Sequence, residues 1–122
     1  MKKILIITFV FIALFTFVAI AQDNIEKKKI EFLISSVQNL KGAKFIRNGA
    51  EHDCVEAAKH LRLKLEKAGN RVKTANDFIR LCASKSYITG TTYIIKFPDG
   101  KTITSEKYLR EKLREYSSTG KN

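Results

Sequence analysis

The sequence predicts a small α+β domain of about four helices, with one short antiparallel β-hairpin before the last helix. Three observations lead to this class. Apolar residues recur at three- and four-residue steps in four segments, a pattern typical of amphipathic helices. Capping residues precede these segments, and glycines follow two of them. One run of β-branched and aromatic residues is followed by Pro98-Asp99-Gly100, which predicts a turn between two strands.

The first helix is expected at about residues 24–40. Asp23-Asn24-Ile25-Glu26 has the spacing of a capping box, and Gly42 follows the segment. Its apolar face comprises Ile30, Leu33, Ile34, Val37 and Leu40. After it, Phe45-Ile46 is interpreted as a short extended or irregular segment and Asn48-Gly49 as a reversal.

Asp53 is expected to cap a second helix, with Glu56 as its capping-box partner and Gly69 as its end. The apolar face of this helix comprises Val55, Ala58, Leu61, Leu65 and Ala68. Thr74 to Asp77 repeats the capping pattern for a third helix that extends to about Ser84.

The hairpin is expected to pair residues 91–97 with 102–104. Ser105 then caps the last helix, in which Glu106 and Arg110 have the favourable i, i+4 spacing. Its apolar face comprises Tyr108, Leu109, Leu113 and Tyr116. Residues 22–116 are therefore expected to form one domain, followed by a flexible polar tail at 117–122.

Residues 1–21 have the pattern of a secretory signal peptide. Two lysines precede an apolar run, and Ala19-Ile20-Ala21 predicts cleavage between Ala21 and Gln22. The alternative is an uncleaved membrane anchor. In either case the domain is expected outside the inner membrane, in the periplasm or secreted, and cleavage would leave no stable membrane span.

The strongly basic composition predicts attraction to anionic surfaces. The formal net charge is +11, and the basic residues are spread over the whole domain rather than clustered. Outside the inner membrane such surfaces are lipid head groups and envelope polymers. We therefore expect an envelope protein or an anionic envelope polymer as partner, and not nucleic acid.

The two cysteines, Cys54 and Cys82, are candidates for a disulfide in an exported protein. The alternative is two separate buried thiols. Zinc is not expected, because Cys54 and His60 differ by about 120° around the second helix and no C-x₂₋₄-C or H-x₃₋₅-H spacing occurs. No cofactor is expected.

The candidate site residues lie in two segments. Arg47, Asn48 and His60 belong to the stretch "FIRNGAEHDCVEAAKHL", whose other polar residues are assigned to caps and turns. Ser84 and Ser86 belong to "ASKSYITGTT", whose hydroxyls could hold an anion with Lys85 alongside. The alternative for this second segment is a hydroxyl-rich connection into a strand, since it follows a helix C-terminus, where the dipole disfavours anions.

Arg47 and His60 are predicted to act as a structural clamp. Arg47 is expected to reach a carboxylate of Glu51, Asp53 or Glu56, and Glu56 lies one turn from His60. The alternative is that Arg47 binds a carboxylate or phosphate of a partner.

Five segments resemble, in order, the motifs of the YfeK-like family, a domain of unknown function found in small exported bacterial proteins. They are "FIRNG" at 45–49, "AAKHL" at 57–61, "DFIRLCASKSYITG" at 77–90, Tyr93 and "DGKTITSEKYL" at 99–109. The resemblance implies export and the same compact fold but no activity. Ala43 stands where relatives often have a cysteine, so a disulfide of those relatives cannot be transferred to this chain. The motif residues are Phe45, Arg47, Asn48, Gly49, His60, Phe78, Ser84, Ser86, Gly90 and Tyr93.

The function predicted from these observations is a non-catalytic binding or structural module for a protein or an anionic envelope component. No coherent catalytic set is present in the sequence. The alternative is a small enzyme or redox protein centred on Cys54, His60 and Arg47.

Overall fold

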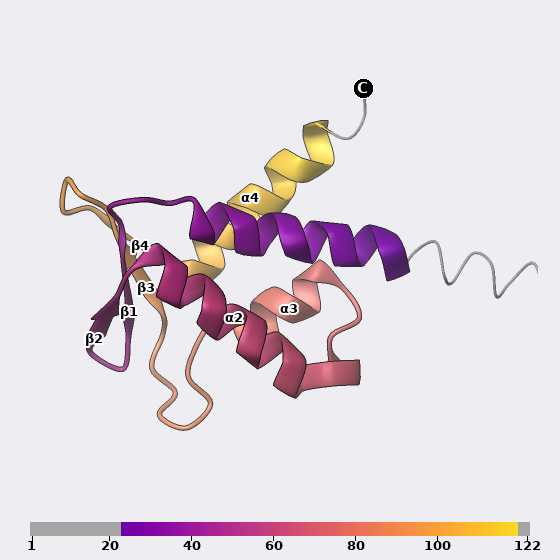
Figure 1. The fold of residues 1–122 in the computed structure, drawn as a ribbon, viewed down its shortest axis with the longest axis horizontal. Coiled ribbons are helices and arrows are strands. Elements are labelled where there is room, and N and C mark those ends of the chain that lie inside the picture. The colour runs from indigo at the N-terminus through magenta and orange to yellow at the C-terminus, as the bar shows by residue number, and fades with distance from the viewer. Residues whose placement is uncertain (1–22, 120–122) are drawn as a thin grey trace, which may run out of the picture.

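The computed structural model describes residues 23–119 and confirms a small single α+β domain (Figure 1). A first helix spans residues 23–38. The other elements in chain order are β1 (Lys44–Arg47), β2 (Ala50–His52), α2 (Cys54–Ala68), the 3₁₀ turn η1 (Gly69–Arg71), α3 (Ala75–Cys82), β3 (Ile94–Lys96), β4 (Thr102–Thr104) and α4 (Ser105–Thr119).

The sheet has four antiparallel strands in the order β2-β1-β3-β4. Strands β3 and β4 form the expected hairpin. Strands β1 and β2 form a second hairpin that was not predicted from the sequence. Asn48 and Gly49 connect its strands with positive φ angles of 52° and 79°, as the tight turn favoured between twisted strands requires. The extended segment at Phe45-Ile46 and the reversal after it were expected, but β2 has three residues and no apolar alternation.

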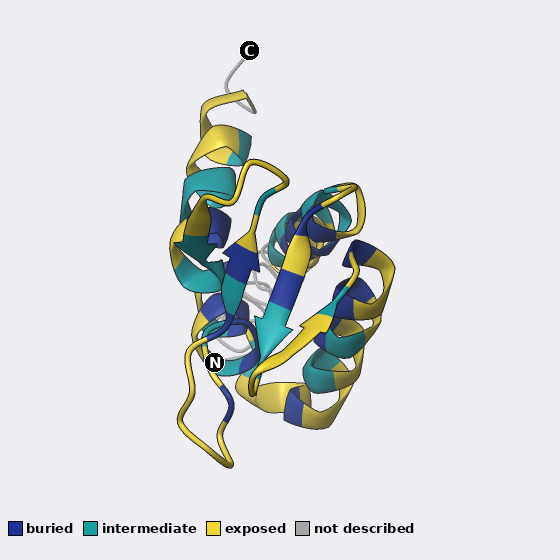
Figure 2. Ribbon diagram, turned by 90° about the vertical axis from the view of Figure 1, so that its left-hand side faces the viewer, coloured by how far each residue is buried: buried dark blue, intermediate teal, exposed yellow. Residues whose placement is uncertain are grey.

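One face of the sheet packs against the helices. Phe45 of β1 pairs with Ile95 of β3 and with His52 of β2, and Ile95 pairs with Ile103 of β4. Phe45 and Ile95 are 8% and 0% exposed. In Figure 2 the strands lie in front of the helices, so the opposite face of the sheet meets solvent.

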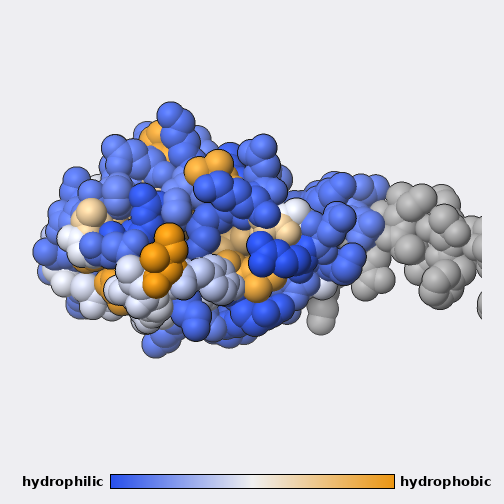
Figure 3. Space-filling view, turned by 90° about the horizontal axis from the view of Figure 1, so that it is seen from below, coloured by the Kyte–Doolittle hydropathy of each residue, from blue (hydrophilic) through white to orange (hydrophobic). Residues whose placement is uncertain are grey.

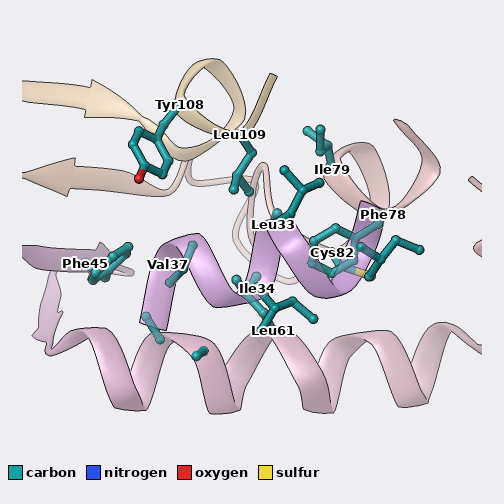
Figure 4. Packing of buried hydrophobic residues seen from close by; sticks show 14 of the residues in the cluster. Leu33, Ile34, Val37, Phe45, Leu61, Phe78, Ile79, Cys82, Tyr108 and Leu109 are labelled. Carbon is teal, nitrogen blue, oxygen red and sulfur yellow. The ribbon is translucent and has the colours of Figure 1, made fainter. Parts of the chain in front are cut away.

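The hydrophobic core lies between the first helix and the elements that surround it. Figure 4 shows Leu33, Ile34 and Val37 of the first helix among buried side chains from α2, α3 and α4. Burying each side chain of this size stabilises the fold by about 1.5–3 kcal/mol. The largest fully buried side chains are Phe78, Leu33, Ile34, Ile79, Ile95, Leu109, Val37 and Cys82.

Three predicted helix ends are confirmed. The Asp53 carboxylate accepts a hydrogen bond from the backbone N–H of Glu56, and Gly69 ends α2. Thr74 and Asp77 form a capping box at α3. At α4, however, the Thr104 hydroxyl and not Ser105 accepts from the backbone, at Lys107.

Two predicted capping-box partners have other roles. The Glu56 carboxylate lies 3.0 Å from Nδ1 of His52 instead of returning to Asp53. The Glu26 carboxylate accepts a 2.9 Å hydrogen bond from the backbone N–H of Ala75, the first residue of α3. Glu26 therefore supplies negative charge to the N-terminus of another helix, where the helix dipole favours it.

The expected disulfide is not present in the structure. Cys54 and Cys82 are free, and both are buried, as the alternative of separate thiols predicted. Cys54 begins α2, whereas Cys82 ends α3, where Lys64 and Arg71 influence its thiol. Burial raises the pKa of the Cys82 thiol.

The predicted signal peptide and its cleavage site at Ala21 and Gln22 lie outside the described residues. At the other end, α4 continues through Thr119, into the segment that was expected to be a tail. None of the helices in residues 23–119 combines the length and apolarity that crossing a membrane requires.

Candidate functional site

A small pocket opens between one end of the sheet and α2. The β-pairing extends one residue beyond β3 and β4, because the backbone N–H of Ser105 bonds the carbonyl of Tyr93. Side chains alternate along a strand, so Tyr93 lies on the helix-facing side with Ile95, and Arg47 lies on that side with Phe45. The pocket is lined by Val37, Phe45, Ile46, Arg47, His52, Ala57, His60, Leu61, Ala83, Tyr93, Ile94, Ser105 and Leu109.

Arg47 and His60, predicted as candidates from the sequence, both line this pocket. The clamp that was predicted for them is wrong. Glu56 binds His52 rather than His60, and Asp53 caps α2.

The register of the sheet explains the missing clamp at Arg47. Glu51 pairs with Ile46, so its side chain points to the opposite face of the sheet from Arg47. Within residues 23–119, no carboxylate lies at ion-pair distance from Arg47. The half-buried guanidinium of Arg47 is therefore available to an external anion.

His60 is held in its neutral form at neutral pH. Its pKa is lowered from 6.5 to about 4, chiefly because partial burial disfavours the charged imidazolium. The positive charges of Arg47 and Lys64 lower it further, followed by His52 and Lys67. No carboxylate contributes to this shift, so the surroundings of His60 are cationic.

Tyr93 lines the pocket, and Lys64 contacts Tyr93 without itself belonging to the lining. Nζ of Lys64 donates a 2.9 Å hydrogen bond to the Tyr93 hydroxyl and lies 4.8 Å from the centre of the Tyr93 ring. The same hydroxyl lies 3.5 Å from Nε2 of His60, and the two rings meet edge to face at 75°. Because Lys64 donates to the Tyr93 oxygen, the hydroxyl proton of Tyr93 is free to point to the imidazole of His60.

The other candidate residues, Asn48, Ser84 and Ser86, stabilise a loop and do not line the pocket. This loop, Ser84 to Tyr93, folds back on itself. The Ser84 hydroxyl bonds the carbonyl of Ile79, and Ser86 is buried with its hydroxyl 3.4 Å from the backbone nitrogen of Thr89. Asn48 accepts a 2.7 Å hydrogen bond from the Thr89 hydroxyl and so joins the loop to the β1–β2 turn. These groups already have partners, which favours the structural interpretation of the segment.

The dimensions of the pocket limit what it can hold. Its cavity measures about 40 Å³. A single water molecule needs about 10–15 Å³ by this measure, so only a small group of atoms fits inside. Most of the lining is apolar, and Arg47 is the one lysine or arginine in it. The pocket therefore suits the end of a ligand and not an entire organic substrate.

The alternative reaction centre of Cys54, His60 and Arg47 is not assembled. Cys54 is 8% exposed and does not line the pocket with the other two residues. In residues 23–119, no three His, Cys, Asp or Glu side chains gather into a possible metal site.

The shifted pKa of His60 predicts reduced stability in acid. The folded state binds His60's proton at about pH 4, whereas the unfolded chain binds it near pH 6.5. Between these values the unfolded state holds more protons, so stability should fall as the pH is lowered from about 6.5 to 4. Because His60 is partly exposed, we expect this contribution to be only about 1–2 kcal/mol. Urea unfolding of the parent and His60→Gln across this range tests it, and an equal pH dependence in both would contradict it.

Lys64 was not predicted as a site residue from the sequence, and Tyr93 was named only as a motif residue of the resembling family. Lys64 lies four residues after His60, so the two share one face of α2, and this spacing was the available signal. Tyr93 required the sheet register, which places it beside Arg47.

Fold and site together define a small α+β domain with an apolar pocket and a cationic side. The chain belongs to the family described as "Family of unknown function (DUF5329)", whose model matches residues 24–117. It is 44% identical over 68 residues to "Uncharacterized protein YfeK" of Salmonella typhimurium strain LT2. That match covers 56% of this chain and 57% of the relative, so it spans little more than half of the relative's length. No solved structure matches. These findings confirm the resemblance to the YfeK-like family.

Proposed function

We propose that this chain is an exported, non-catalytic binding module whose pocket takes the end of an anionic ligand from the cell envelope. The observation that carries the proposal is the guanidinium of Arg47. It lies beside the neutral His60, with Lys64 nearby, and has no carboxylate partner in the described chain. A planar guanidinium is suited to bidentate binding of a carboxylate.

The apolar part of the pocket supports a ligand class. A carboxylate that carries a short aliphatic group can place that group in the cavity of about 40 Å³ while its oxygens meet Arg47. A bare phosphate would leave the apolar walls formed by Val37, Leu61 and Leu109 without a contact. We therefore infer a peptide or envelope polymer that ends in a carboxylate next to a small aliphatic side chain.

Two features of the sequence support export and an envelope partner. The N-terminal segment has a signal-peptide pattern with cleavage between Ala21 and Gln22, and the chain carries a formal net charge of +11. Periplasm or secretion is therefore the proposed location, with a membrane-anchored form if the signal is retained.

Calorimetric titration with N-acetyl-alanyl-alanine tests the proposed ligand class. The free acid should bind, whereas its C-terminal amide should bind at least about tenfold more weakly, the loss expected from removing one charged hydrogen-bonded pair. Inorganic phosphate should also bind more weakly than the acid, because it leaves the apolar walls without a contact. Equal binding of the acid and the amide would contradict a carboxylate site, and preferential binding of phosphate would contradict the apolar contact.

A further inference from the structure

The tip of the Ser84–Tyr93 loop exposes two large apolar side chains. Tyr87 is 60% exposed and Ile88 is 97% exposed. Figure 1 shows the loop extending away from the helices and the sheet, and Figure 2 shows it mostly exposed. Seen from the side toward which the loop extends, Figure 3 shows several small apolar areas separated by mostly hydrophilic surface.

The loop is internally hydrogen-bonded, so this exposure is built into its shape. The backbone N–H of Ser86 bonds the carbonyl of Thr91, and the N–H of Gly90 bonds the carbonyl of Ser86. A β-bridge joins Lys85 to Thr92. Gly90 has a φ of 73°, which favours glycine at this reversal. The chain thus holds Ile88 outward instead of turning it into the core.

The surroundings of the tip are positively charged. The loop contains no aspartate or glutamate, but it does contain Lys85. Nζ of Lys64 lies 5.3 Å from the centre of the Tyr87 ring and donates to the carbonyl of Lys85. Cations therefore border the apolar tip, and no carboxylate of the loop opposes an anionic surface.

We propose that this loop docks the domain on an anionic lipid surface, with Ile88 and Tyr87 entering the interfacial layer. An aliphatic tip beside an aromatic ring and lysines matches the layered chemistry of a membrane interface, where the ring lies at head-group depth and the lysines meet lipid phosphates. A protein partner would need a broad complementary surface, about 800 Å² on each side, which a narrow convex tip does not offer. The proposal shares Lys64 with the site at the pocket, but it rests on the tip of the loop and does not depend on ligand binding in the pocket.

Fluorescence can test the docking site because the chain contains no tryptophan. The exported form that begins at Gln22, carrying Tyr87→Trp, is mixed with vesicles of phosphatidylglycerol and phosphatidylcholine, and quenching by lipids brominated on their acyl chains is measured. Val55→Trp is the matched control, since Val55 is an exposed apolar residue of α2. The control distinguishes docking by the loop from general attachment of the chain.

The Trp at position 87 should shift to shorter wavelength and be quenched, whereas the Trp at position 55 should not. Ile88→Ser added to the Tyr87→Trp chain should weaken the response about tenfold, the order expected for losing one aliphatic insertion. Vesicles of phosphatidylcholine alone should give little response. A solvent-exposed Trp at position 87, equal quenching at positions 87 and 55, or equal responses to both vesicle types would overturn the proposal.

Discussion

Replacing Arg47 by methionine should weaken binding of N-acetyl-alanyl-alanine at least about tenfold and leave the fold intact. A hydrogen bond to a charged group contributes about 1.5–3 kcal/mol, which corresponds to roughly 10- to 150-fold in affinity. Stability should change by less than about 0.5 kcal/mol, because Arg47 has no carboxylate partner in the described chain and the methionine retains much of its apolar stem. Calorimetric titration and thermal melting of the same preparation measure both effects.

Arg114→Met is the matched control for this change, because it removes the same charge from an exposed position on α4. It should bind the peptide like the parent, which would exclude a general effect of net charge. A melting temperature that drops strongly in Arg47→Met would instead restore the clamp, and unchanged affinity would remove Arg47 from the site.

Phe78→Ala should have the largest effect on stability. Phe78 is 0% exposed and contributes its ring to the core between α3 and the first helix (Figure 4). Truncation of a buried phenylalanine costs about 3–5 kcal/mol, through lost transfer energy and the cavity left behind. In a domain of this size that loss lowers the melting temperature by at least about 12 °C. Circular dichroism during heating measures it.

Tyr87→Ala is the control for Phe78→Ala, since it removes an aromatic ring that is 60% exposed. It should cost at most about 1 kcal/mol, the upper range for an exposed cation–π contact such as the one with Lys64. Similar melting temperatures for the two variants would show that the core is not centred where the structure places it.

Much of the fold follows from local sequence patterns. The capping box of Thr74 and Asp77 and the turn at Pro98 to Gly100 depend on residues close in sequence, and both predicted elements are present. The β1–β2 hairpin was missed because β2 has only three residues and no apolar alternation. Its strand conformation depends on its pairing with β1. The cap that Glu26 provides for α3 joins residues 49 positions apart, so no local spacing reveals it.

The candidate site was only partly predictable for the same reason. Arg47 and His60 were found because neither has a local structural role. Their partners were wrong, since the sheet register turns Arg47 toward Tyr93 and away from Glu51, while His52 takes Glu56. A charge partner is a tertiary property, and three nearby carboxylates in the sequence did not determine it.

The central claim is that Arg47, His60, Lys64 and Tyr93 form a cationic site for an anionic group. The most direct test is an NMR titration of the His60 imidazole with and without N-acetyl-alanyl-alanine. The free protein should show a pKa of about 4, and bound carboxylate should raise it because a nearby negative charge stabilises the imidazolium. By linkage, affinity should then increase as the pH falls toward that pKa. An ordinary pKa near 6.5 in the free protein, or no change with saturating peptide, would contradict the account.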